Sequence, residues 1–408
     1  MRLGTAIAVD GVTPVDEVLG VFFPAPYSFT GEDTFEIHCH GSPVVVEQVM
    51  AGAIAAGARA ADRGEFTRRA VLNGKLDLLQ AEAVADLIDA RMAAGATAAW
   101  RQLQGALSEE LAAVRMALLA VLADIEAEVD FTDDELPDAD CRRRCEAIEA
   151  AARRLEALLR GFATSRCQRE GLRVAFTGKP NAGKSSLVNR LLGSSRMIVS
   201  EEPGTTRDIV EEAVDLGGIA FVLTDTAGIR EAVGAAEIQA VERARDCARE
   251  ADLCVVVLDA TSPPDWSDAR LWDSVRGPDA IVVLNKTDLG GHVAAELRPR
   301  FAAVGAAVFE TSALTGDGCM ALVDAMIATA RRRIEADPVG ISRVRHRAAL
   351  ERALGPLRCA HRLAASEDAC ELAAAQLRTA LAELAALSAP VDNEDVLDLI
   401  FSEFCIGK

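Results

Sequence analysis

Gly178-Lys179-Pro180-Asn181-Ala182-Gly183-Lys184-Ser185 is the stretch that decides the fold of the central part of this chain. It matches the spacing GxxxxGK[ST], follows the apolar run Leu172–Phe176 and precedes a segment with helical spacing, which is the context the motif requires. Glycines let backbone N–H groups turn inward around phosphate oxygens, and a helix N-terminus adds positive potential. We expect Lys184 to reach the β- and γ-phosphates of a nucleotide and Ser185 to ligate Mg²⁺.

Two switch-like elements follow the loop in the order that a nucleotide triphosphate site needs. Thr206, within Gly204–Asp208, is expected to close over the γ-phosphate and ligate Mg²⁺. Asp225 begins Asp225-Thr226-Ala227-Gly228 at the end of an apolar run, and it is expected to hold Mg²⁺ through water while the Gly228 amide senses the γ-phosphate. The alternatives are a chance glycine-rich turn and an exposed turn, and the order of the elements weakens both.

The base is predicted to be guanine. Asp288, in Asn285-Lys286-Thr287-Asp288, can accept hydrogen bonds from guanine N1–H and the 2-amino group, a donor pair that adenine lacks. Thr311–Leu314 is expected to supply backbone amides to guanine O6. The residues expected to contact GTP are Asn181, Ala182, Gly183, Lys184, Ser185, Ser186, Ser200, Glu201, Glu202, Pro203, Gly204, Thr205, Thr206, Asp225, Thr226, Ala227, Gly228, Asn285, Lys286, Asp288, Ser312, Ala313 and Leu314.

The position directly after the Asp-Thr-Ala-Gly element is occupied by Ile229. Many small GTPases carry a glutamine there to orient water, and isoleucine has no group for that task. Hydrolysis therefore needs another group, and we consider Glu237 and a cation that replaces an arginine finger. Arg207 and Arg230 are rival fingers, with a solvated switch residue as the alternative for each.

The composition limits which kinds of partner the chain can bind and in which cellular environment it works. The 408 residues carry 43 basic and 63 acidic side chains, a net charge of −20, so the chain is a poor non-specific binder of nucleic acid. The basic positions Arg68, Arg69, Lys75 and Arg331–Arg333 are better explained as solvated helix faces than as nucleic-acid contacts. Ten cysteines without a CxxC pair indicate a reducing, cytoplasmic environment. No apolar run reaches the ~18 residues of a membrane span, and no signal peptide is expected.

Hydrophobic periodicity divides the chain into four segments. These are a small α+β unit at 1–73, helices at 74–170, alternating strands and helices at 171–335, and helices at 336–408. The expected strands are Val18–Phe23, Thr34–Cys39, Leu172–Phe176, Phe221–Thr224, Leu253–Leu258, Ile281–Leu284 and Val308–Thr311, with helices at Val44–Ala56 and Arg142–Leu159. A helical stripe contains Leu103, Leu107, Leu111, Val114, Leu118, Leu122, Ile125 and Val129, and another contains Leu377, Leu381 and Leu384. We predict a multidomain fold in which a Ras-like P-loop domain with a mostly parallel sheet is inserted into a helical bundle.

These features together resemble the MnmE (TrmE) family of tRNA-modification GTPases. Tyr27–Asp33 is similar to the family's N-terminal signature, and Arg63–Phe66, continued by Leu72–Leu78, is similar to its second. The chain ends in Phe404-Cys405-Ile406-Gly407-Lys408, which resembles the family's tail. The resemblance implies the Mg²⁺ ligands Ser185 and Thr206, and a GTPase that works when two G domains meet across a homodimer.

The same resemblance implies a potassium ion in place of an arginine finger, and Glu237 as the residue that orients water indirectly. The potassium ligands would be Asn181, Ser200, Glu202 and Thr205. It also implies a flavin-dependent partner of the MnmG (GidA) type, with which members add a carboxymethylaminomethyl or aminomethyl group to the wobble uridine of certain tRNAs. A formyl-tetrahydrofolate would lie near Glu36, Lys75 and Lys408.

Several alternatives stay open. Cys405 resembles a cysteine with a role in the modification chemistry, and the alternative is an exposed thiol without a role. The terminal Cys-Ile-Gly-Lys is a poor match to a prenylation box, because lysine is a poor terminal residue for one. His38-Cys39-His40 is better read as structural than as a metal site, because strand alternation sends the cysteine to the opposite face.

The beginning of the chain departs from the family. Residues 1–17 are not expected to share the resemblance, which starts at about Val18, and an arginine that contacts folate is expected upstream. We therefore expect either a start site chosen too late or a truncated N-terminal domain. Two further alternatives are a ribosome-assembly GTPase of the Era/Der type and a GTP-binding protein that does not modify tRNA.

Overall fold

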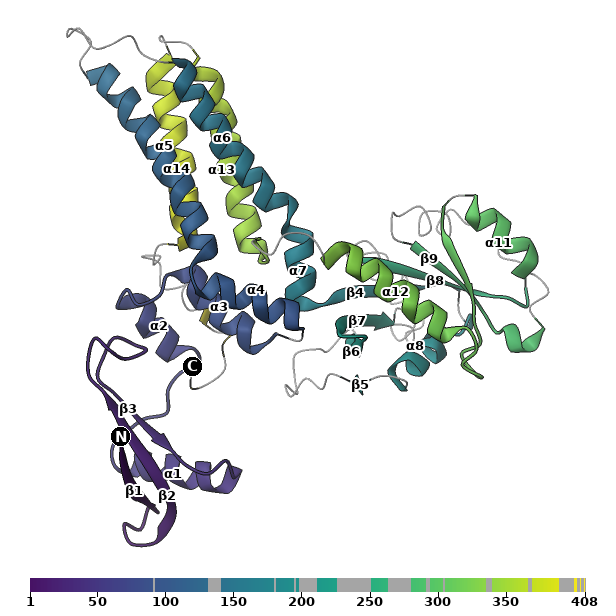
Figure 1. Ribbon diagram of the computed structural model, residues 1–408, viewed down its shortest axis with the longest axis horizontal. Coiled ribbons are helices and arrows are strands. Elements are labelled where there is room, and N and C mark those ends of the chain that lie inside the picture. The colour runs from purple at the N-terminus through teal and green to yellow at the C-terminus, as the bar shows by residue number, and fades with distance from the viewer. Residues whose placement is uncertain are drawn as a thin grey trace, which may run out of the picture. The chain divides into compact units, whose positions relative to one another are not determined.

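The computed structural model describes residues 1–90, 92–130, 141–179, 181–193, 196–197, 211–225, 251–262, 280–290, 294–303, 305–334, 340–365, 369–388, 400–401, 404 and 407 (Figure 1). The chain forms two compact units. The first unit contains Met1–Ile88, Ala99–Leu159 and Val344–Lys408, and the second contains Asp89–Ala98 and Arg160–Arg343. The first unit is therefore assembled from segments that lie on both sides of the second unit in the sequence.

The first unit begins with a three-stranded antiparallel sheet. Its strands are β1 (Arg2–Ile7), β2 (Pro14–Phe23) and β3 (Thr34–His38), in the order β1-β2-β3, and helix α1 (Pro43–Ala55) follows. β2, β3 and α1 agree with the predicted ranges to within a few residues. β1 was not predicted, because its ladder with β2 pairs residues that carry little apolar alternation of their own.

Helices make up the rest of the first unit. They are α2 (Glu65–Leu72), α3 (Leu78–Ile88), α5 (Ala106–Asp130), α6 (Cys141–Arg160), α13 (Val344–Leu363) and α14 (Cys370–Ser388), with α4 (Ala93–Leu103) running from the second unit into the first. α14 packs against both α13 and α5, so helices from before and after the second unit share one bundle (Figure 1). The buried side chains of α5 and α14 include Leu107, Leu111, Val114, Leu118, Leu122, Ile125, Leu377, Leu381 and Leu384, as their spacing predicted.

The second unit is built on a seven-stranded sheet in the order β10-β9-β8-β4-β7-β6-β5. Its strands are β4 (Leu172–Thr177), β5 (Arg196–Met197), β6 (Glu211–Leu216), β7 (Ile219–Asp225), β8 (Leu253–Asp259), β9 (Ala280–Asn285) and β10 (Ala307–Glu310). The helices are α7 (Phe162–Glu170), α8 (Lys184–Gly193), α11 (Ala294–Ala302) and α12 (Cys319–Ile334), with a short 3-10 turn at Thr287–Leu289. The five predicted strands are present and mutually parallel, and β6 and β5 add an antiparallel edge that was not predicted.

The parallel register places the functional loops at one edge of the sheet. β4 leads into the glycine-rich loop, β7 ends at Asp225, β9 ends at Asn285, and β10 is followed by Thr311. Ligands of open α/β sheets bind at the carboxyl ends of the strands, which is where these loops begin. None of the helices in the described ranges is long and apolar enough to cross a membrane.

Candidate functional site

Backbone geometry shows why the loop after β4 needs glycine at two positions. Gly178 has φ +140°, and a Cβ there would lie 2.1 Å from the carbonyl oxygen of Val257. Gly183 has φ +92°, and a Cβ there would lie 2.1 Å from Nδ2 of Asn285. Asn181 also has a positive φ, 63°, a conformation that asparagine tolerates better than most residues. The loop therefore holds a shape that any side chain at Gly178 or Gly183 would disturb.

Lys184 begins α8, and its residue is only 4% exposed. Its ammonium group donates to the carbonyl oxygens of Gly178, at 3.0 Å, and Lys179, at 2.9 Å. The cation is thereby held over the loop whose amides are suited to phosphate oxygens. Ser185 and Ser186 follow in the first turn of α8 and are exposed, so their hydroxyl groups are accessible to a Mg²⁺–nucleotide complex.

Asn285 joins the phosphate loop to the loop after β10. The residue is 1% exposed, and its Nδ2 donates to the carbonyl oxygen of Ala182 at 3.0 Å. Its Oδ1 accepts from the backbone N–H of Ala313 at 3.0 Å and from Oγ1 of Thr311 at 3.3 Å. The two ends of the amide thus bind two different loops, so the geometry indicates that Asn285 positions both loops around a nucleotide.

Asp288 carries the group that is suited to reading the base. Oγ of Ser312 donates to Oδ1 of Asp288 at 2.6 Å and accepts from the backbone N–H of Thr315 at 3.1 Å. Because an ionised carboxylate only accepts and the N–H of Thr315 only donates, the proton of the Ser312 hydroxyl is directed at Asp288. Asp288 is exposed, and the hydroxyl fixes its orientation while Oδ2 keeps its accepting capacity.

Lys286 lies between these two residues with φ 68°, and it points to a different partner. Its Nζ lies 2.7 Å from Oδ2 of Asp259, at the end of β8. Burial acts to raise the pKa of Asp259, but the hydrogen bonds from Lys286 and Thr261 outweigh it and hold the pKa below its ordinary value. This ion pair fixes the turn that presents Asp288.

Part of the predicted site lies outside the described residues. This part comprises Ser200, Glu201, Glu202, Pro203, Gly204, Thr205, Thr206, Arg207, Thr226, Ala227, Gly228, Ile229, Arg230, Glu237, Cys405 and Lys408, together with the side chain of Asp225. In the part of the chain that is described, no group of three or more His, Cys, Asp or Glu side chains could hold a metal ion. His40 pairs with Asp16, with Nδ1 2.8 Å from Oδ1, and β3 ends at His38, so Cys39 lies beyond the strand whose alternation was used for this stretch.

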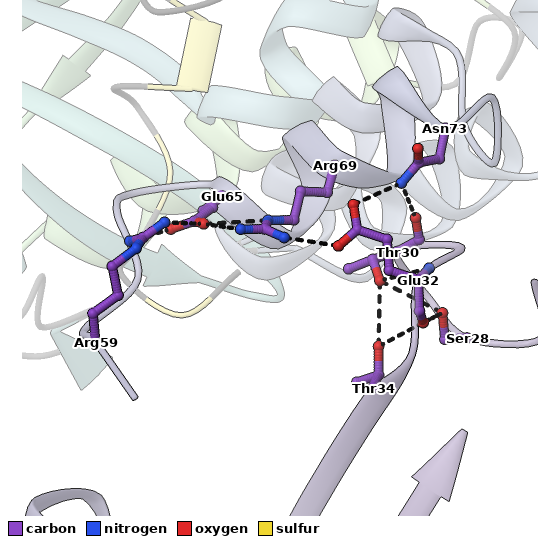
Figure 2. A network of polar contacts seen from close by, with 8 residues as sticks. All are labelled: Ser28, Thr30, Glu32, Thr34, Arg59, Glu65, Arg69 and Asn73. Carbon is purple, nitrogen blue, oxygen red and sulfur yellow. Dashed lines mark hydrogen bonds and ion pairs between the residues drawn. The ribbon is translucent and has the colours of Figure 1, made fainter. Parts of the chain in front are cut away.

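The two N-terminal signatures meet in a polar network that sequence reasoning missed (Figure 2). Glu65 accepts hydrogen bonds from Arg59 and from Arg69, and Arg69 also donates to Glu32 at 2.7 Å. Asn73 donates to Glu32 at 3.1 Å and to the carbonyl oxygen of Thr30 at 2.8 Å. The only signal in the sequence was that all but one of these residues fall within or beside the two signatures.

The network fastens the loop of the first signature to α2. Hydrogen bonds from Arg59, from the backbone N–H of Asp62 and from Arg69 lower the pKa of Glu65 to about 2. Lys75 donates to the carbonyl oxygen of Pro26 at 3.0 Å, while Glu36 lies on β3, half exposed, beside His38. The structure therefore places Glu36 and Lys75 in the same unit but gives them different partners.

The end of the chain packs against the second signature. Ile400, Phe401 and Phe404 are buried with a cluster from α2 and α3, namely Val71, Leu78, Ala81 and Ala85. Gly64 has φ +64°, and a Cβ there would lie 2.9 Å from the ring of Phe401 and 3.1 Å from Cβ of Phe404. The residue before Cys405 is thus anchored at the start of α2.

Comparison with known proteins identifies relatives along the whole chain. Residues 1–75 match the family described as "GTP-binding protein TrmE N-terminus", and residues 78–405 match "MnmE helical domain". The first match includes residues 1–17, so the expectation that they fall outside the resemblance is wrong.

Curated relatives agree with these family matches. A protein of Heliobacterium modesticaldum named tRNA modification GTPase MnmE is 41% identical over 100% of this chain and 89% of its own. Proteins of the same name from Parvibaculum lavamentivorans and Aquifex aeolicus are 44% and 38% identical, each over 97% of this chain and 87% of their own. With both family models matched and such identity along its length, the chain belongs to the MnmE (TrmE) family of tRNA modification GTPases.

Proposed function

We propose that this protein couples GTP hydrolysis to modification of the wobble uridine of certain tRNAs. It would add a carboxymethylaminomethyl or aminomethyl group together with a flavin-dependent partner of the MnmG type. The observation that carries the proposal is the guanine-reading arrangement of Asp288 and Ser312 in a chain that is 41% identical to a tRNA modification GTPase over its whole length.

The phosphates bind at the loop after β4. Lys184 turns from its carbonyl partners to the β- and γ-phosphates, and Ser185 ligates Mg²⁺ together with Thr206. The main-chain amides of Asn181–Ser186 cradle the phosphate oxygens, and Ser312–Leu314 face guanine O6. Asn285 keeps these two loops at a fixed separation through its bonds to Ala182 and Ala313.

Hydrolysis would use a potassium ion and a glutamate that orients the attacking water indirectly. Asn181 is exposed at the tip of the phosphate loop, where its amide oxygen is free to join a cation site with Ser200, Glu202 and Thr205. A cation there supplies the positive charge that an arginine finger provides elsewhere. Glu237 orients the attacking water, because Ile229 carries no group that does so.

Homodimerisation and folate binding belong to the N-terminal part of the first unit. Apolar side chains are exposed on the sheet and on α1, at Leu3, Ile7, Leu19, Phe22, Phe35, Ile37, Val44, Val46, Met50 and Ile54. Such a surface favours burial against a second copy of the chain. Glu36, Lys75 and Lys408 are the residues proposed to hold a formyl-tetrahydrofolate there, and Cys405 is the proposed thiol of the modification chemistry.

The test is complementation in a bacterial strain that lacks its own protein of this family. Expression of the full chain is expected to restore the modified wobble nucleoside in hydrolysed bulk tRNA, measured by liquid chromatography and mass spectrometry. The matched control is Lys184→Ala, which keeps the fold of the first unit and removes the phosphate contact. Unmodified uridine with the wild-type chain would refute the proposal, and a ribosome-assembly defect cured in its place would favour the Era/Der alternative.

A further inference from the structure

A single buried carboxylate joins three helices of the first unit. Glu82, on α3, is 1% exposed, and its Oε2 lies 2.6 Å from Nε2 of His346, which is 0% exposed. Arg345 binds both oxygens of the same carboxylate through one edge of its guanidinium. Nε lies 3.2 Å from Oε1 and Nη2 lies 3.0 Å from Oε2. Two consecutive residues of α13 therefore converge on one side chain of α3.

Arg345 extends the connection to a third helix. Its Nη1 donates to the carbonyl oxygen of Ala386 at 3.2 Å, and its Nη2 donates to that of Leu387 at 3.4 Å. Both carbonyls lie in the last turn of α14, where carbonyl oxygens lack partners within the helix and the helix dipole favours a cation. Glu82, Arg345 and His346, which we call the junction triad, thus fix α3, α13 and the end of α14 to one another.

The junction triad is an inefficient way to stabilise a helical bundle. Removing charged groups from water costs free energy, and apolar side chains of similar volume often replace buried ion pairs without loss of stability. Nδ1 of His346 is buried and has no hydrogen-bond partner among the described residues. Because hydrogen bonds are directional, the junction triad fixes how α3, α13 and α14 are placed relative to one another. Apolar packing would stabilise the same bundle with a smaller loss of solvation free energy.

The sequence position of the junction triad suggests which geometry it fixes. The chain crosses between the two units four times, after Ile88, Ala98, Leu159 and Arg343. Glu82 lies less than two helical turns before the first crossing, and Arg345 is the residue after Val344. The carboxylate of Glu82 therefore joins the segments beside two of the four crossings, the first and the last along the chain.

We propose that Glu82 is a positioning residue that transmits the nucleotide state of the second unit to the helices of the first. A change in the second unit acts on the first through the connections between them, and the junction triad makes α3, α13 and the end of α14 respond together. The link to tRNA modification rests on the proposed function, but the transmission itself does not. Arg345 and His346 bind the Glu82 carboxylate from α13, and Arg345 also reaches the end of α14.

The experiment measures amide hydrogen exchange of the full-length protein with GDP and with a non-hydrolysable GTP analogue. In the wild type, exchange of α3 and of the last turn of α14 is expected to differ between the two nucleotides. In Glu82→Gln this difference should vanish, while affinity for either nucleotide stays within about twofold, because the loops that bind the nucleotide belong to the second unit and Glu82 belongs to the first. Loss of nucleotide affinity in this variant would contradict the assignment.

The matched control is a buried arginine in the same bundle, away from the crossings at Ile88 and Val344. The side chain of Arg144 is 5% exposed and binds Asp124 at 2.6 Å as well as Glu128. Arg144→Gln should lower Tm by an amount similar to that caused by Glu82→Gln. It should leave the nucleotide-dependent exchange of α3 and α14 intact. If Arg144→Gln abolishes the difference as Glu82→Gln does, the junction triad is only structural and the proposal is overturned.

If Glu82→Gln fails to fold, a second variant separates the contact of Arg345 with Glu82 on α3 from its contacts with the end of α14. Arg345→Lys keeps a cation near Glu82 but loses the fork that reaches two partners at once. The nucleotide-dependent change should persist in α3 and disappear in the last turn of α14. The proposal is wrong if Arg345→Lys keeps the nucleotide-dependent change in both helices. It is also wrong if hydrogen exchange of the wild type is the same with both nucleotides.

The tRNA readout distinguishes this proposal from the proposed function. If the wild-type chain restores wobble modification, Glu82→Gln should lower modification at least ~10-fold more than it lowers the kcat of GTP hydrolysis. A wild-type chain that does not restore modification counts against the proposed function alone, because the exchange experiment still decides the junction triad.

Discussion

Replacing Asp288 by asparagine is expected to exchange the base specificity of the nucleotide site. The proton of the Ser312 hydroxyl is directed at Oδ1 of Asp288, because the carboxylate only accepts while the N–H of Thr315 donates to the hydroxyl oxygen. In Asp288→Asn the amide oxygen must therefore face Ser312, and the amide NH₂ must face the base. Guanine presents an amino group to that NH₂, whereas xanthine presents a carbonyl oxygen.

The size of the effect follows from the bonds that change. Asp288 is placed to accept two charge-assisted hydrogen bonds, each worth about 1.5–3 kcal/mol. Their loss together predicts a decrease in GTP affinity of roughly 10²- to 10⁴-fold. Xanthosine triphosphate regains a donor–acceptor pair in the variant and should bind more tightly than GTP.

Isothermal titration with GTP and with xanthosine triphosphate measures both affinities. The control is Ser312→Ala, which removes the orienting hydroxyl and should weaken GTP binding by about tenfold without reversing the preference for guanine. An Asp288→Asn variant that binds GTP within threefold of the wild type would refute the assignment of Asp288 to the base.

Three further predictions concern hydrolysis and stability. Glu237→Ala should slow GTP turnover by about 10²- to 10⁴-fold and leave nucleotide affinity unchanged, and equal turnover in a single-turnover assay would remove its role. Exchange of K⁺ for Na⁺ should lower turnover by at least about tenfold in the wild type and have little effect in Asn181→Ala; a wild type indifferent to the cation argues against the potassium site. Burial acts to raise the pKa of Glu82, but the bonds from His346 and Arg345 lower it from 4.5 to about 2. Because the folded pKa is depressed, this carboxylate contributes stability above pH 4.5 that is lost as pH falls towards 2, on the order of 3 kcal/mol, and denaturant titrations of the wild type and Glu82→Gln should converge over that range.

The glycine-rich loop after β4 and the turn that carries Asp288 were predictable because both depend on short, local sequence patterns. Gly178 and Gly183 have positive φ angles that the motif requires, and Asp288 follows its strand at the expected place. The buried stripes of α5 and α14 were readable for the same reason, since helical periodicity is a local property. The parallel order of the five central strands then follows from the alternation of strands and helices.

Features that depend on distant pairing were not predictable. The β1 strand forms because β2 supplies its hydrogen-bond partners, and the edge strand β6 forms because β7 does. The contact between Glu82 and His346 joins helices on opposite sides of the second unit in the sequence, and each residue taken alone reads as an ordinary polar position. The role of Asn285 as a tie between loops was likewise hidden, because its motif suggests a contact with the base.

The discontinuous bundle has a consequence for how the chain is made on the ribosome. α5 buries its apolar stripe partly against α14, which begins at Cys370. About 245 residues separate Ile125 from that helix, so roughly 10 to 50 s of synthesis pass before it is translated. During that interval the stripe of α5 has no final partner, whereas the nucleotide-binding unit is contiguous enough to fold early. We therefore expect nascent chains in which the second unit has left the ribosome and α14 has not to bind GTP already while still requiring a chaperone to shield α5.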